Sequence, residues 1–256
     1  MAFDVRKIYA VWLREVKRFI NSKARIVGSL GQPILFLVAL GGGFSGLIPK
    51  ESVPGSSYTA FLLPGILAMT VMFTSIFAGV SIIWDREFGF LKEMLAAPTS
   101  RETIVLGRVL GGATSAIFQG TVMLALGLLF TGIPIPANPL NLAGIFLLMV
   151  GFSASLVATG IALASLIREV ETFQLLINFL IMPLFFLSSA LFPIESMPDW
   201  MQYATSVNPV SYAVDGMRAL LVGTSHFGLA TDFGVTFGVL AVMLVIASYL
   251  FNKTSI

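Results

Sequence analysis

The chain has 256 residues, of which 57% are hydrophobic and only 11% are charged, and its mean hydropathy is +0.93. A soluble domain carries about 25% charged residues, so this chain has too few to cover a soluble surface, and the composition predicts an integral membrane protein. The net charge of +2 comes from basic residues at membrane edges and does not indicate a nucleic-acid-binding patch. With no cysteine and one histidine, His226, the chain excludes disulfides, thiol catalysis and a multi-histidine metal site.

Residues 1–25 have the pattern of a basic amphipathic helix. Apolar residues recur at helical spacing, at Val5, Ile8, Tyr9, Trp12, Val16, Phe19 and Ile20. Lysines and arginines fill the remaining positions and the end of the segment. This pattern is typical of a helix that lies in the membrane interface, in contact with lipid head groups.

Six apolar runs follow, over residues 26–48, 58–83, 103–130, 142–167, 173–192 and 233–251. At a rise of about 1.5 Å per residue, runs of this length cross a hydrocarbon core of about 30 Å. The sequence therefore predicts an all-α fold, in which residues 1–256 form a single polytopic transmembrane domain with six spans. Small residues at Ala154, Ala158 and Ala162 and at Gly160 and Ala164 favour close helix packing in the fourth span.

The distribution of basic residues predicts the orientation. Thirteen of the fifteen lysines and arginines lie before the first span, around the second loop, at the fourth loop or in the tail, which leaves Lys50 and Arg218 on the other side. Because basic loops stay in the cytoplasm, we expect both termini and residues 85–101 to be cytoplasmic, in the plasma membrane. The connection over residues 193–232 is then external.

The charged segment over residues 85–101 is the longest between two apolar runs. Trp84, Phe88, Leu91 and Leu95 recur at helical spacing, charged residues occupy the other positions, and Pro98 predicts the end of a helix. The pattern fits a short interfacial helix that presents a docking surface, and it fits an ordinary solvated loop helix equally well.

The external connection is too apolar for a free loop and is broken by Pro193, Pro198 and Pro209. Backbone groups at membrane depth must be paired, so we expect two short re-entrant helices that dip in from the outer face. Asp215 and Arg218 are three residues apart and either pair with each other or contact substrate.

Motifs for catalysis are missing from the sequence. There is no phosphate-binding G-x-x-x-x-G-K-[ST] loop, no H-E-x-x-H and no G-x-S-x-G, and acidic residues avoid the middle of every predicted span. We therefore expect a non-catalytic chain without a bound cofactor, and the work of any uphill transport would come from another subunit. A carrier or channel that needs no ATPase, and a lipid-modifying membrane enzyme, are the alternatives. Gln174 and Asn178 would face either a subunit interface or the transport pathway.

Three stretches resemble the ABC-2 type exporter permeases, near the branch of drug-resistance and nodulation-factor exporters. They are DREFGFLKEMLAAPTSR at 85–101, FLSSALFPIESMPDW at 186–200 and NPVSYAVDGMR at 208–218, and the likeness in order, spacing and topology covers essentially the whole chain. Ser188-Ser189 departs from the Ser-Gly pair expected of the family.

The resemblance implies an exporter with two permease subunits, the second expected to be identical, and two ATP-binding subunits that hold ATP and magnesium. The segment at 85–101 would be the coupling helix of each permease, on which ATP binding in the partner subunits would push. The cargo would be amphipathic, lipid-linked or a glycan. Residues that match the coupling helix are Glu87, Phe88, Gly89, Leu91, Glu93 and Pro98, with Arg101 at its end. Residues that match the external motif are Asn208, Pro209, Tyr212, Asp215 and Arg218. The protein would contact membrane lipids and reside in a bacterial inner membrane.

Overall fold

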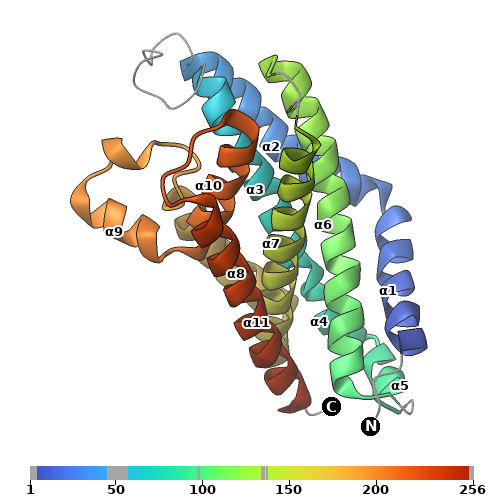
Figure 1. Ribbon diagram of the computed structural model, residues 1–256. Coiled ribbons are helices and arrows are strands. Elements are labelled where there is room, and N and C mark those ends of the chain that lie inside the picture. Colours follow the sequence, from blue (N-terminus) through green and yellow to red (C-terminus); the bar gives the residue numbers. More distant parts are fainter. Residues whose placement is uncertain (1–4, 45–56, 97–98, 134–135, 137, 254–256) are drawn as a thin grey trace.

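The computed structural model describes residues 5–44, 57–96, 99–133, 136 and 138–253, and every regular element in these ranges is helical (Figure 1). The helices are α1 (Val5–Ile20), α2 (Lys23–Phe44), α3 (Tyr58–Ala78), α4 (Val80–Glu87), α5 (Phe90–Ala96), α6 (Arg101–Thr131), α7 (Pro139–Leu166), α8 (Val170–Phe186), a short 3-10 helix (Ile194–Ser196), α9 (Asp199–Val207), α10 (Pro209–Val222) and α11 (Leu229–Lys253). The fold of the described residues is therefore all-α, as the sequence predicts.

Polar residues and glycines at the helix ends explain several of these boundaries. Ser57, Ser100 and Asn138 precede α3, α6 and α7, and each side-chain oxygen accepts a hydrogen bond from a backbone N–H in the first turn. Such caps pair donors that a helix leaves free at its start. Gly132 and Gly223 end α6 and α10 in the left-handed conformation, which glycine adopts without a steric cost.

Among the described residues, five helical stretches are long and apolar enough to cross a membrane. They are Ile26–Phe44, Tyr58–Glu87, Arg101–Thr131, Pro139–Leu166 and Leu229–Lys253. The fifth predicted span, over residues 173–192, is represented by α8, which has 17 residues and ends at Phe186. The chain then turns through residues 187–192 instead of continuing the helix. The protein thus has multiple membrane-spanning helices, while the count of six stays a prediction.

Helix α3 lies at the centre of the bundle. Its residues are buried on nearly every side, against α2, α6, α7 and α10. The helix α11 packs mainly along α7 and leaves much of its own surface exposed, which is the arrangement of a lipid-facing helix. Figure 1 shows α1 beside α6 at one side of the bundle and α9 projecting from the other.

The junction of α3 and α4 crosses α7 at two glycines. A Cβ atom at Gly79 would collide with the backbone of Gly160, and a Cβ at Gly160 would lie 2.5 Å from the carbonyl oxygen of Ile76. Only hydrogen atoms fit between these backbones, so the small residues permit the contact that dispersion forces then stabilise. Of the small residues predicted to favour close packing in the span over residues 142–167, Gly160 lies at this crossing.

Replacing Gly160 by Leu is therefore expected to force α7 away from the junction of α3 and α4. Overpacking a dense interior costs about 1–3 kcal/mol, and more where the obstacle is backbone. We expect a lower thermal unfolding midpoint in detergent and less protein in the membrane fraction. Gly42→Leu is the matched control, because a Cβ at Gly42 meets nothing within 4 Å. Equal stability of the two variants would show that the close crossing is not required.

Candidate functional site

The segment predicted as one coupling helix over residues 85–101 consists of separate pieces in the structure. Asp85 and Glu87 belong to the last turns of α4, the chain turns at Phe88 and Gly89, and α5 follows. Gly89 has a φ of +77°, which side chains strongly disfavour, so the glycine breaks the helix here. The prediction of a single helix was wrong at this turn. Pro98 lies outside the described residues.

The turn between α4 and α5 presents a mixed apolar and charged surface. Phe88 is 83% exposed at its tip, whereas Leu91 is 1% exposed and anchors α5 to the bundle. Glu87, Lys92 and Glu93 are exposed around them. Aromatic residues are enriched in protein interfaces and dominate the energy of such contacts, so Phe88 is a candidate contact residue.

A buried cluster of charges supports this turn from behind. Asp85 accepts hydrogen bonds from Arg14 of α1, at 3.1 and 2.7 Å, and from Arg108 of α6. Arg18 lies 3.6 Å from the same carboxylate, and Glu15 lies 3.4 Å from Arg14. Asp85 is 4% exposed and Arg108 is 3% exposed, so this pair is shielded from water, whereas the side chains of Arg14 and Arg18 are 30% exposed at the edge of the cluster. The sequence analysis missed this site, since it placed Asp85 on a solvated face.

Helix α1 packs directly on α6, and glycines permit the contact. A Cβ at Gly107 would lie 2.6 Å from Cβ of Val11, and one at Gly111 would lie 2.5 Å from Cβ of Glu15. Arg14 extends this contact to α5, because its guanidinium stacks 4.0 Å above the ring centre of Phe90. The amphipathic N-terminal helix therefore belongs to the same unit as the turn.

Two further arginines connect this region to the ends of other helices. Arg86 donates to the carbonyl oxygens of Ile167 at 3.0 Å and Ala164 at 3.4 Å, at the end of α7. Arg101 donates to the carbonyl of Asn252 at 2.6 Å, at the end of α11. Cations at a helix C-terminus pair free carbonyls and favour the helix dipole. The α4–α5 turn is thus tied to α1, α6 and α7, and the start of α6 is tied to the end of α11.

On the opposite side of the fold, Asp215 of α10 holds the loop that leads into α11. Its Oδ2 accepts hydrogen bonds from Ser225 Oγ at 2.9 Å and from the backbone N–H groups of His226 at 2.8 Å and Phe227 at 2.9 Å. Arg218 lies 3.8 Å from Oδ1, so the two residues do pair. Both are buried, and the carboxylate is satisfied inside the protein.

Arg218 also fixes the turn that follows α8. It donates to the carbonyl oxygen of Ser189 at 2.7 Å, and its guanidinium lies 4.1 Å from the ring centre of Phe61. Ser189 has a φ of +55°, a conformation that favours glycine. This is the position at which the family resemblance leads one to expect glycine, so the turn keeps its geometry with a serine.

The start of α10 is anchored in the same turn. Asn208 caps α10 through Val210 N at 3.0 Å, and its amide nitrogen donates to the carbonyl oxygens of Leu184 at 2.6 Å and Leu187 at 3.0 Å. Pro209 occupies the first helical position, as its sequence pattern predicts. The hydroxyl of Tyr212 donates to the carbonyl of Ser206 at 2.6 Å. Asn208, Pro209 and Tyr212 thus have structural roles, because they hold the start of α10 against the ends of α8 and α9.

The two candidate pathway residues lie on the outward face of α8. Gln174 and Asn178 are both exposed, and Gln174 also borders a cavity against α3 and α4. The structure does not bring either of them near the external motif. Within the described ranges, no group of three or more histidine, aspartate or glutamate side chains is arranged to hold a metal ion.

Comparison with known proteins agrees with this architecture. A family model described as ABC-2 type transporter matches residues 6–222. The inner membrane transport permease YadH of Escherichia coli is 28% identical over 94% of this chain and 91% of its own length. Proteins named transport permease ycf38 are 30% identical in Cyanophora paradoxa, over 87% of this chain and 78% of theirs, and 26% identical in Porphyra purpurea, over 98% and 89%. The chain therefore belongs to the ABC-2 type transporter family, as a multi-pass permease of the kind that works with an ATP-binding subunit.

Proposed function

We propose that this protein is the membrane subunit of an ATP-driven exporter, and that the ATP-binding subunit docks on the α4–α5 turn. The observation that carries the proposal is the combination of an exposed Phe88 with a buried charge cluster directly behind it. A surface that only faced solvent would need neither the aromatic tip nor the rigid support.

The connections of the turn supply a route for mechanical work. A push on the turn would reach α1 through Arg14 and Phe90 and α7 through Arg86, and Arg101 links the start of α6 to the end of α11. Movement of packed helices as units is the usual form of such transitions, because dense interiors transmit displacement. ATP and magnesium would bind in the partner, and this chain would contribute no catalytic group.

At the external side, α9 and α10 would form a cap over the pathway that keeps exported cargo from returning. The burial of Asp215 and Arg218 supports a structural role for this pair.

We propose an assembly of two identical permeases and two ATP-binding subunits in the inner membrane, with both termini cytoplasmic. Its cargo would be amphipathic, lipid-linked or a glycan, and annular lipids would surround it.

The docking proposal predicts the behaviour of Phe88→Ala. Truncation of a central aromatic anchor typically costs 2 kcal/mol or more, about a 30-fold loss of affinity, so co-purification of the ATP-binding subunit should fall sharply. Phe179→Ala is the matched control, since Phe179 is 82% exposed on α8 and Phe88 is 83% exposed. As a separate variant, Glu93→Lys should also weaken docking, because it reverses a charge at the rim of the contact. Full retention of the ATP-binding subunit by Phe88→Ala and by Glu93→Lys would refute docking on this turn.

A further inference from the structure

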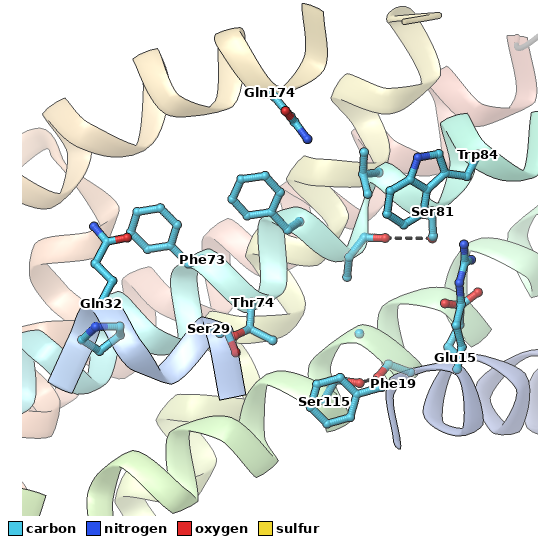
Figure 2. A pocket seen from close by; sticks show the side chains of 18 residues that line it. Glu15, Phe19, Ser29, Gln32, Phe73, Thr74, Ser81, Trp84, Ser115 and Gln174 are labelled. Carbon is cyan, nitrogen blue, oxygen red and sulfur yellow. Dashed lines mark hydrogen bonds between the residues drawn. The ribbon is translucent and has the colours of Figure 1, made fainter. Parts of the chain in front are cut away.

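A cavity of about 380 Å³ lies between α1, α2, α3, α4, α6 and α8, next to the charge cluster (Figure 2). Its volume is in the range of sites for small ligands, about 300–1,000 Å³. In Figure 2 the labelled side chains of Gln174, Phe73 and Trp84 surround it from different helices. Gln32 and Gln174 are exposed on α2 and α8, so the cavity opens at the surface between these two helices.

The lining changes in character along the cavity. Phe73 and Phe77 of α3 provide an apolar wall, which suits a hydrocarbon chain. Arg18 and Glu15 of α1 lie at the end next to the charge cluster, together with Trp84 of α4. The site therefore has one apolar part and one ionic part, which is the complement of an amphipathic molecule.

The charges at the ionic end do not balance. Arg14, Arg18 and Arg108 face two carboxylates, Glu15 and Asp85, which leaves one positive charge in excess. Asp85 takes its hydrogen bonds from the other two arginines, whereas Arg18 lies 3.6 Å away. The Nη1 atom of Arg18 is buried and is the atom that lies 3.6 Å from Oδ1 of Asp85, so it has an ionic contact but no hydrogen-bond acceptor among the described residues. A buried guanidinium nitrogen without an acceptor is costly, so an anion at this position would be stabilised.

We propose that this cavity binds an anionic amphiphile, with a phosphate or carboxylate head group on Arg18 and an acyl chain along Phe73 and Phe77. The site lies behind the α4–α5 turn, and its lining includes Trp84 and Ser81 of α4. Its use as the place where cargo is taken up rests on the exporter function proposed above. Binding itself depends only on the residues of this chain.

Trp84 allows the proposal to be tested directly. The sequence has three tryptophans, so Trp12→Phe with Trp200→Phe leaves Trp84 as the single fluorophore, at the wall of the cavity. The full chain would be reconstituted without the ATP-binding subunit, and brominated-chain phosphatidylglycerol or phosphatidylcholine would be titrated as quencher. We expect phosphatidylglycerol to reach half-maximal quenching at a mole fraction about 10-fold lower, the effect of one charge-assisted hydrogen bond.

The variants separate a specific site from general attraction to a basic surface. Arg18→Gln should remove the preference, whereas Lys17→Gln, which removes the same charge from an exposed neighbour, should keep it. Thr74→Phe, which fills the cavity and leaves Arg18 in place, should weaken quenching by both lipids. Equal quenching by the two lipids, an equal loss in Lys17→Gln, or displacement of the lipid by inorganic phosphate alone would overturn the proposal. Since the partner is absent, such a failure would leave docking on the α4–α5 turn untouched.

Discussion

Replacing Asp85 by Ala is expected to lower the free energy of unfolding by about 3–5 kcal/mol, the cost of leaving a buried charge without its partner. Arg108 is 3% exposed and would lose its hydrogen-bonded carboxylate, keeping only the longer contact of 3.9 Å to Glu15, while Arg14 would lose both of its short contacts to α4. The measurement is the thermal unfolding midpoint of the purified permease in detergent. Glu87→Ala is the control, because Glu87 is an exposed acidic residue on the same helix.

The second arm of this experiment removes the positive partner as well. Asp85→Ala combined with Arg108→Met should recover much of the lost stability, since an apolar side chain of similar length leaves no unpaired charge at that position. In the assembled complex, the same variants should reduce the extent to which cargo stimulates ATP hydrolysis, because α1 and α6 would no longer move together with α4. An Asp85→Ala variant as stable as Glu87→Ala would show that the cluster does not support the turn.

Replacing Asp215 by Ala is expected to have an effect of similar size on the external side. Three donors would lose their shared acceptor, the Oδ2 atom, and Arg218 would keep a buried charge without its neighbouring carboxylate. We expect a loss of about 3–5 kcal/mol in unfolding free energy and a large loss of export. Asp199→Ala is the control, as Asp199 is exposed at the start of α9.

The double variant distinguishes a coupled pair from two independent contacts. Adding Arg218→Ala to Asp215→Ala should cost less than the sum of the two single losses, because neighbouring residues couple by about 0.5–3 kcal/mol. The co-purified ATP-binding subunit should remain with the folded fraction of both variants, since the pair lies far along the fold from the α4–α5 turn. Strictly additive losses would contradict the pairing of these residues in solution.

The helices themselves were largely predictable from the sequence. Long apolar runs indicate the spans, because a helix surrounded by lipid needs apolar residues on every side. Helical spacing of apolar residues indicates α1, because only one face of an interfacial helix contacts lipid. Polar caps such as Ser100 and Asn208 are local signals of the same kind. These features depend only on residues close together in the chain.

The charge cluster was not predictable from one sequence. Arg14 and Asp85 are 71 positions apart, and Arg108 follows Asp85 by 23, so no local pattern connects them. Asp85 is followed by Arg86 and Glu87, so in the sequence this buried residue looks like part of an exposed charged run. An arginine inside the start of α6 and Gly107 next to it were the available signals, and only the fold shows what they contact.

The short α8 was hidden for a different reason. Residues 173–192 form a continuous apolar run, which predicts a span by length alone. The helix ends because Asn208, more than 20 residues later, pairs the carbonyl oxygens of Leu184 and Leu187, and because Ser189 adopts a left-handed conformation. Within the run, Ser188-Ser189 stands where the family resemblance leads one to expect Ser-Gly, and without the glycine this pair is a weak signal for the end of a helix.

The most direct test of the account is photo-crosslinking from the α4–α5 turn in intact membranes. A photoreactive phenylalanine analogue placed at Phe88 is predicted to capture the ATP-binding subunit, because this exposed side chain would lie at the centre of the contact. The same analogue at Trp200, which is 67% exposed on α9, should capture none, since α9 would face the opposite side of the membrane. No capture from Phe88 in a complex that hydrolyses ATP would contradict the docking site, and capture from Trp200 would contradict the orientation of the chain.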